Sequence, residues 1–230
     1  MEDQLARTRL LIGDEGIEKL KSASVIVFGV GGVGSFVVEA LARSGIGKLT
    51  MVDYDRVTLS NLNRQLPALH STLGEPKVEV MKKRIADINP GCKVITVQEY
   101  YRAGNKELFF QEDYDYVVDA IDSVASKVGL IAHCVERKLK IVSSMGAGNR
   151  LDPFGFRLGD IGETFGCPLA KIVRKELRKR GIFSGVKTVF SPKPCLNTKG
   201  TVPGSISFVP PVAGMLLASV VVNDLLEKNT

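Results

Sequence analysis

Four polar side chains in the first two thirds of the chain have the types that chemistry on phosphates needs: Asn61, Arg64, Lys77 and Asp122. Asn61 and Arg64 lie three residues apart in the stretch SNLNRQ, so a helical turn places them on one face. Lys77 follows Pro76 and therefore suits the first turn of a helix, where backbone N–H groups attract anions. Carboxylates such as Asp122 are common ligands of magnesium.

A reaction on a nucleoside triphosphate would use all four side chains. When a carboxylate attacks the α-phosphate, pyrophosphate is expelled and negative charge builds on the leaving group. Arginine, lysine and a divalent metal stabilise that charge. Taken singly, each residue also has a structural explanation, as a capping Asn or Asp or as a surface Arg or Lys. Leu62 and Asn63 are expected only to shape the turn.

A glycine-rich segment, VIVFGVGGVGS, precedes these residues. Its glycines form a G-x-G-x-x-G pattern with a fourth glycine inside it: Gly29, Gly31, Gly32 and Gly34. This pattern between a strand and a helix binds the phosphates of nucleotides, and Asp53, 19 residues after Gly34, is placed to accept hydrogen bonds from a ribose. The motif predicts nucleotide binding but does not distinguish NAD from ATP.

An NAD-dependent oxidoreductase is therefore an open alternative. Such an enzyme needs little positive charge beyond the pyrophosphate, and it usually has a His, Lys or Tyr as acid or base at the nicotinamide. No such group is tied to the glycine turn, because His70 and His133 are isolated and more typical of structural histidines. A further alternative is a catalytically silent subunit that uses the fold as a scaffold.

The elements that must position these residues alternate between strand and helix. Helical patterns separate short β-branched runs, which predicts an α/β, Rossmann-like, doubly wound and mostly parallel sheet. Ligands of such sheets bind at the carboxyl ends of the strands. The predicted strands are Ser24–Phe28, Leu49–Asp53, Lys93–Val97, Tyr116–Asp119 and Lys140–Ser143, and the predicted helices are Gly34–Arg43, Pro76–Asn89, Lys106–Phe110 and Val124–Arg137.

After Gly148 the pattern loosens into a C-terminal extension of short strands and helices. VKTVFS is typical of a strand, and Pro192–Ser205 is typical of a mobile loop. A final apolar helix begins near Pro210–Pro211. Its apolar stretch, Pro211–Val222, is too short to span a bilayer, so it indicates a core helix and no integral membrane segment, with a peripheral membrane contact as the weaker alternative.

The charge and the cysteine content of the chain bear on three properties: RNA binding, cellular compartment and zinc binding. The chain of 230 residues has a formal net charge of +6, and 171–181 contain six basic residues and one acidic residue. This run fits either the solvated face of a helix or a surface for RNA. The start of the chain is polar, which favours a cytoplasmic protein with reduced thiols. Cys92, Cys134, Cys167 and Cys195 form no C-x-x-C pair, which disfavours zinc.

Four segments, GVGGVGS, VDYDRVTLSNLNRQ, GEPKVEVMKKRIADINP and VVDAIDS, resemble the ATP-binding core of the ubiquitin-activating and ThiF/MoeB superfamily. This resemblance covers about 9–148 and implies adenylation of a carboxylate with ATP and Mg²⁺. By position, Asp53 would bind the ribose, Asp122 would hold the metal, and three residues would contact the phosphates: Asn61, Arg64 and Lys77. Asp55 and Gln65 would belong to the same site. Arg9, with Arg7 as competitor, would reach the γ-phosphate bound by the partner subunit of a homodimer.

Other segments, among them VVDAIDSVASKVGLIAHC, CPLAKIVRKELRKRGI and GSISFVPPVAG, resemble the tRNA threonylcarbamoyladenosine dehydratases of that superfamily. The resemblance implies ATP-dependent cyclisation of a modified adenosine beside the anticodon, with tRNA as substrate and sulfur-relay proteins as possible partners. We expect one adenylation domain over 1–230, in which 149–230 supply the substrate and dimer region. The basic run would place five residues near tRNA phosphates: Arg174, Lys175, Arg178, Lys179 and Arg180.

The alternative within the superfamily is activation of the C-terminal glycine of a ubiquitin-like sulfur-carrier protein. Such enzymes often hold zinc with two C-x-x-C pairs, which this chain lacks. Some dehydratases have a cysteine directly before the VFS element, where this chain has Thr188. A persulfide at that position therefore has no part in the chemistry of this chain.

Overall fold

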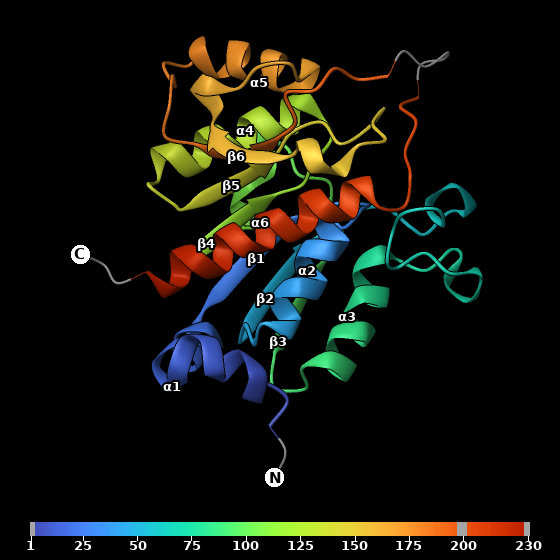
Figure 1. The fold of residues 1–230 in the computed structure, drawn as a ribbon, viewed down its shortest axis with the longest axis vertical. Helices are drawn as coiled ribbons and strands as arrows, with labels where there is room; N and C mark the ends of the chain where they lie inside the picture. The colour runs from blue at the N-terminus through green and yellow to red at the C-terminus, as the bar shows by residue number, and fades with distance from the viewer. Residues whose placement is uncertain (1–2, 197–201, 228–230) are drawn as a thin grey trace.

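The computed structural model describes residues 3–196 and 202–227, which build a seven-stranded sheet in the order β3-β2-β1-β4-β5-β7-β6 (Figure 1). Neighbouring strands are parallel except at the edge, where β6 runs antiparallel to β7. The mostly parallel α/β fold is confirmed. The strands are β1 (Ser24–Phe28), β2 (Lys48–Val52), β3 (Lys93–Val97), β4 (Tyr116–Asp119), β5 (Ile141–Ser144), β6 (Arg157–Asp160) and β7 (Lys187–Phe190).

Helices cover both faces of the sheet, because alternate strand residues point to opposite sides. Val25 and Val27 belong to the core under α2, α3 and α6, whereas Ile26 and Phe28 belong to the core under α4 and α5. Figure 1 shows α6 lying across the sheet beside α2, with α4 and α5 stacked near β6. The helices are α1 (Ala6–Ser22), α2 (Gly34–Arg43), α3 (Lys77–Ile88), α4 (Val124–Glu136), α5 (Pro168–Arg178) and α6 (Val209–Leu226).

Two segments depart from the sequence prediction. The helix predicted at Lys106–Phe110 is wrong, since Ala103–Leu108 form 3-10 turns instead. Asn105 is the reason: its backbone is not helical, and its side chain accepts from Arg102 N and donates to Tyr100 O at 2.8 and 2.9 Å. The N-terminal helix α1 was not predicted, because its sequence is polar and its axis breaks at Gly13, where φ is +69°.

The prediction of a core helix at the C-terminus is confirmed, although α6 is longer than expected. By length and apolar composition alone its 18 residues could cross a membrane. Instead α6 packs along α2 and β5. Gly214 permits the close approach, because a Cβ there would lie 2.4 Å from the carbonyl oxygen of Val33. The helix therefore packs against the beginning of α2, next to the glycine turn.

Candidate active site

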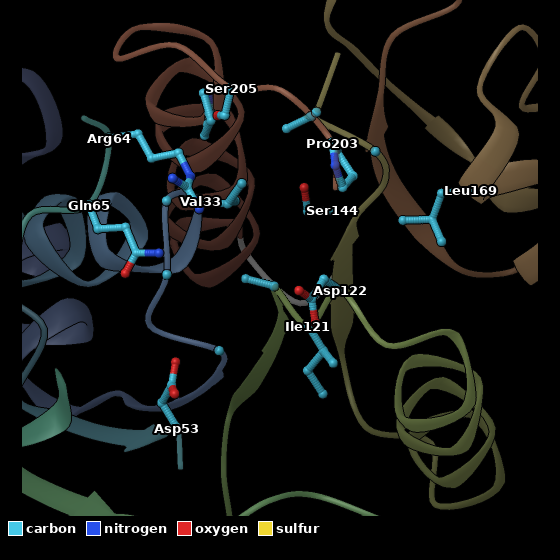
Figure 2. Close-up of a pocket in the computed structure, with 18 of the residues that line it drawn as sticks. Val33, Asp53, Arg64, Gln65, Ile121, Asp122, Ser144, Leu169, Pro203 and Ser205 are labelled. Carbon is cyan, nitrogen blue, oxygen red and sulfur yellow. The ribbon is translucent and has the colours of Figure 1, made fainter. Parts of the chain in front are cut away.

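A cleft of about 690 Å³ opens at the carboxyl ends of the central strands. The chain order reverses at β1, whose neighbours β2 and β4 continue on opposite sides, and ligands of doubly wound sheets bind at this point. Figure 2 shows Asp53, Arg64 and Gln65 on one side of the cleft and Leu169 on the other, with Asp122, Ser144 and Pro203 drawn between them. Apart from Gly34 and Arg9, every candidate site residue lines this cleft.

The glycine turn has no room for side chains where it joins β1 to α2. Gly29 has a φ of +87°, and a Cβ there would lie 2.7 Å from the carbonyl oxygen of Ala120. A Cβ on Gly34 would lie 1.8 Å from the carbonyl oxygen of Gly29. Gly31 and Gly32 line the cleft itself. The turn therefore presents backbone N–H groups and the start of α2 to the cleft, an arrangement that favours anions.

Asp53 fixes the glycine turn from below. One carboxylate oxygen accepts a hydrogen bond from Val30 N at 2.7 Å, and the other accepts one from Asp55 N at 2.8 Å. Burial raises the pKa of Asp53, although the charge of Lys77 and the two backbone hydrogen bonds lower it. Asp53 thus shapes the turn as well as lining the cleft beside it.

Lys77 lies at the first position of α3, as predicted from Pro76. Its ammonium group forms an ion pair with Asp55 at 2.7 Å. The Lys77 side chain is only 4% exposed, whereas that of Asp55 is 43% exposed. The backbone N–H of Lys77 also donates to the carbonyl of Asp55 at 3.1 Å. Asp55 therefore orients a nearly buried cation at the wall of the cleft.

Asn61 closes the turn that carries Arg64 and Gln65. It ends the short 3-10 helix η1 (Leu59–Asn61), and its carbonyl accepts from Arg64 N at 3.1 Å and Gln65 N at 3.0 Å. The prediction that Asn61 and Arg64 share a face is confirmed, since both line the cleft. The buried Oε1 of Gln65 has no hydrogen-bond partner among the described residues. The Nε2 of the same amide lies beside the glycine turn, since a Cβ on Gly31 would be 3.7 Å from it.

The Arg64 guanidinium is held by its own turn. Its Nη1 donates to Ser60 O at 2.9 Å and to Asn63 Oδ1 at 2.8 Å. From the sequence, Asn63 was expected only to shape the turn. In the structure it has a second role, because its Nδ2 also donates to Ser205 O at 3.0 Å. One asparagine therefore connects the arginine of the cleft with the segment that leads into α6.

Asp122 points into the middle of the cleft from the loop after β4 (Figure 2). Asp119 shapes this loop by accepting a hydrogen bond from Ile121 N at 3.0 Å. In residues 3–196 and 202–227, Asp122 is exposed and makes no side-chain hydrogen bond or ion pair, and no group of three His, Cys, Asp or Glu side chains gathers to hold a metal. A single free carboxylate fits magnesium, which commonly binds one or two carboxylates together with substrate phosphates and water.

A buried ion pair beneath Asp122 was missed by the sequence analysis. The ammonium group of Lys127 lies 2.7 Å from Asp119 Oδ2, 2.8 Å from Ser144 O and 3.3 Å from Ser143 Oγ. Both charged side chains are 0% exposed. The pair joins the ends of β4 and β5, and so holds the two loops that line the centre of the cleft. The sequence did contain one indication of this pair, because Lys127 is a charged residue within the apolar pattern of α4.

Arg9 does not line the cleft of its own chain. Its guanidinium pairs with Asp3 and Asp14 on the N-terminal segment. The next two residues, Leu10 and Leu11, are 87% and 86% exposed.

Comparison with known proteins places this fold and cleft in a family. The family profile described as the ThiF family matches residues 4–230. A tRNA threonylcarbamoyladenosine dehydratase of Bacillus subtilis is 46% identical over 244 residues, covering 99% of this chain and 96% of the relative.

Solved structures give the same result. The tRNA N6-threonylcarbamoyladenosine dehydratase of Escherichia coli in complex with ATP has a TM-score of 0.91 and 35% identity, covering 97% of this chain and 93% of that one. Its complex with AMP has a TM-score of 0.90 and 36% identity, covering 96% and 92%. The chain therefore belongs to the ThiF family and is similar along its length to the tRNA threonylcarbamoyladenosine dehydratases.

Proposed function

We propose that this chain is an enzyme that uses ATP to dehydrate threonylcarbamoyladenosine in tRNA, closing the threonylcarbamoyl group into a ring. One observation carries the proposal: a single cleft brings together the glycine turn, Arg64, Lys77 and Asp122, in a chain similar over 99% of its length to a dehydratase of this type. The dehydratase from Escherichia coli has been solved with ATP and with AMP, the substrate and the product that this chemistry requires.

The proposed reaction has two steps. A carboxylate oxygen of the threonyl group attacks the α-phosphorus of ATP, and the bond to the pyrophosphate breaks. An atom of the neighbouring carbamoyl group then attacks the activated carbonyl carbon and loses a proton, while AMP leaves with the former carboxylate oxygen. The products are the cyclic nucleoside, AMP and pyrophosphate, and the nucleoside has lost the elements of one water.

Positive charge in the cleft would act on the first step. Lys77, oriented by Asp55, and Arg64, held by Ser60 and Asn63, would stabilise the charge that builds on the departing pyrophosphate. The N–H groups of the glycine turn and the amide of Asn61 would bind the other phosphate oxygens, and Asp53 would bind the ribose. Asp122 would hold Mg²⁺, which when bound neutralises phosphate charge.

A homodimer is part of the proposal. Arg9 lies outside the cleft of its own chain and is followed by Leu10 and Leu11, whose exposure is unusual for a free surface. We infer that a second copy covers these leucines and receives Arg9 near the terminal phosphate of its ATP. The predicted readout is restoration of activity by mixing two inactive variants.

The tRNA would contact α5. Five residues on α5 and directly after it were proposed to bind phosphates; among them Arg174 donates to Thr164 Oγ1 at 2.6 Å, and Lys179 pairs with Glu176 at 2.7 Å. Both are therefore committed to contacts within the protein. Of these five residues, Lys175, Arg178 and Arg180 are exposed and have no ion-pair partner in the described part of the chain, which makes them the better candidates for tRNA phosphates.

The decisive experiment is incubation with ATP, Mg²⁺ and tRNA that carries the open threonylcarbamoyl group. We expect the nucleoside to lose the mass of one water, with release of AMP and pyrophosphate in equal amounts. Unmodified tRNA and the Arg64→Ala variant are the controls and should give neither change. Pyrophosphate exchange that depends on a ubiquitin-like carrier but not on tRNA would replace this proposal with activation of a sulfur carrier.

A further inference from the structure

The direction of the proposed adenylation locates the acceptor. In a displacement at the α-phosphorus, the attacking and leaving oxygens lie roughly in line on opposite sides. Arg64 and Lys77 mark the side toward which pyrophosphate departs. The threonyl carboxylate must therefore arrive from the other side, where Leu169 lines the cleft opposite Arg64 and Ser144 and Pro203 lie between them (Figure 2).

This far side of the cleft differs in chemistry from the nucleotide side. Its wall contains a thioether, a thiol and two aliphatic side chains, from Met145, Cys167, Leu169 and Pro203. No charged side chain belongs to the lining that 144–149, 167–169 and the described part of the 195–205 segment contribute. We call the space beside these four residues the acceptor pocket. A neutral, flat, partly apolar group fits it better than a charged one.

The segment Val202–Ser205 forms one wall of the acceptor pocket, which we call its roof. Hydrogen bonds from two other segments hold it in place. Val202–Ser205 line the cleft, and Asn149 makes a double hydrogen bond with Gly204. Asn149 N donates to Gly204 O at 2.8 Å, and Gly204 N donates to Asn149 Oδ1 at 2.6 Å. Asn63 holds the next residue through its bond to Ser205 O at 3.0 Å.

The backbone of Asn149 is adapted to this role. Its φ of +56° lies in the left-handed region, which an L residue other than glycine seldom adopts and which often marks a functional constraint. Its carbonyl also accepts from Leu196 N at 2.7 Å, on the other side of 197–201, which lie outside the described residues. Of the loop predicted as mobile over Pro192–Ser205, both described flanks are therefore anchored to Asn149.

We propose that the acceptor pocket receives the modified adenine base and the aliphatic part of its threonyl group, with Asn149 as the residue that positions the roof over them. This inference rests on the proposed function. Enzymes that act on a base take it out of its stack and hold it between aromatic or apolar side chains. Sulfur atoms of methionine make favourable contacts with aromatic rings. A glycine-terminated carrier peptide has no side chain to fill the same space.

Leu169→Trp tests the occupant. Leu169 is half-buried at the beginning of α5, where it packs against the core and also lines the cleft, so a larger side chain there takes up part of the pocket. We expect the KM for modified tRNA to rise at least about tenfold, with the affinity for ATP unchanged. Leu169→Met, which conserves volume, is the matched control and should behave like wild type. An equal loss of ATP affinity, or an unchanged KM for tRNA, would overturn the assignment.

Asn149 provides a second test that does not depend on the tolerance of Leu169 to substitution. Asn149→Gly keeps the left-handed backbone and loses only the acceptor for Gly204 N, so the KM for tRNA should rise roughly three- to tenfold. Asn149→Asp retains an acceptor oxygen and should restore most of the loss. A purely structural role predicts instead a parallel loss of ATP binding and thermal stability in Asn149→Gly.

The two proposals fail in different ways. If the wild-type protein does not convert modified tRNA, the proposed function is wrong, whatever the variants do. The pocket is then tested by direct binding of tRNA with and without the threonylcarbamoyl group, measured in the presence of ATP. Equal affinity for the two tRNAs, or a preference that Leu169→Trp leaves unchanged, would refute the pocket separately.

Discussion

The two sides of the cleft are built from different materials. The nucleotide side consists of charged and amide side chains from short local motifs, with the glycine turn and Asn61–Gln65 as its main parts. The acceptor pocket consists of apolar side chains and backbone from three segments that are distant in the sequence. Phosphates need directed charge, whereas a neutral base needs shape, so the two occupants that we propose would be recognised by different means within one cleft.

This difference predicts that variants separate into two groups. Changes on the nucleotide side should alter ATP affinity and turnover, and changes on the acceptor side should alter the KM for tRNA. Loss of that separation would show that the two sides act as one site.

The largest effect is expected for Lys77→Ala on the nucleotide side. Removing a cation that stabilises charge in the transition state should lower kcat for AMP release by about 10²–10³-fold. Lys82→Ala, an exposed lysine on the same helix, is the matched control and should change kcat little. Release of AMP at the wild-type rate by Lys77→Ala would remove Lys77 from the chemistry.

Mixing Arg9→Ala with Lys77→Ala tests whether the nucleotide side is completed by a second subunit. In a mixed dimer one site has both residues intact, so random exchange should restore about a quarter of wild-type AMP release. Each variant alone should remain nearly inactive. If mixing restores nothing although the subunits exchange, as followed by labelled chains, Arg9 does not act across an interface.

Asp122→Asn should change the metal requirement rather than the affinity for tRNA. An amide binds Mg²⁺ more weakly than a carboxylate, so we expect at least about a tenfold rise in the Mg²⁺ concentration for half-maximal activity. Asp87→Asn, an exposed acid on α3, should leave the titration unchanged. The measurement is AMP release against Mg²⁺; an unaltered midpoint would contradict a metal role for Asp122.

On the acceptor side, Lys175→Ala combined with Arg178→Ala should weaken tRNA binding without changing ATP affinity. Log affinity falls with log salt concentration, and each lost phosphate contact makes this negative slope shallower by about 1. The double variant should therefore have a slope that is shallower by about 2. The double variant Lys82→Ala and Lys83→Ala on α3 removes the same charge elsewhere. An identical salt dependence in both double variants would show that α5 does not meet tRNA.

The smallest expected effect is on the pH dependence of ATP affinity, which should change when Asp53 on the nucleotide side is replaced. Because burial raises the pKa of Asp53, its ionised form is lost at a higher pH than that of an ordinary aspartate as the solution is acidified. Affinity for ATP should therefore fall on acidification, by up to about tenfold per pH unit below that pKa. Asp53→Asn should bind ATP more weakly but with a flatter pH profile between neutral and mildly acidic solution. A wild-type profile in Asp53→Asn would assign the titration to another group.

The nucleotide side was predictable because its residues are close in sequence and chemically distinctive. Gly29, Asp53, Asn61, Arg64 and Lys77 follow one another across β1, β2 and the turns after them, so the α/β pattern alone brings them to one edge. Their arrangement as a group follows from parallel strands whose carboxyl ends coincide. Their individual roles in catalysis are left to the variants above.

The buried pair Lys127–Asp119 and the acceptor pocket were not predictable in the same way. A lysine in an apolar helix pattern does not indicate which residue it pairs with. In the sequence, Asp119 was identified only as the last residue of a strand. Nothing in the sequence marks Met145, Cys167, Leu169 and Pro203 as neighbours; in the structure Met145 and Cys167 are buried, Leu169 is half-buried and Pro203 is exposed. Their proximity depends on how β5, α5 and the segment before α6 meet, and no local motif encodes this.

The sequence by itself determined the class of fold and the edge of the sheet at which the candidate phosphate-binding residues gather, because alternating strand and helix patterns and a glycine turn are local properties of the chain. The tertiary structure alone decided what Asp55, Asn63 and Asn149 do. Each contacts a partner distant in sequence, respectively Lys77, Ser205 and Gly204, and such contacts exist only after the sheet has assembled and α6 has packed against α2.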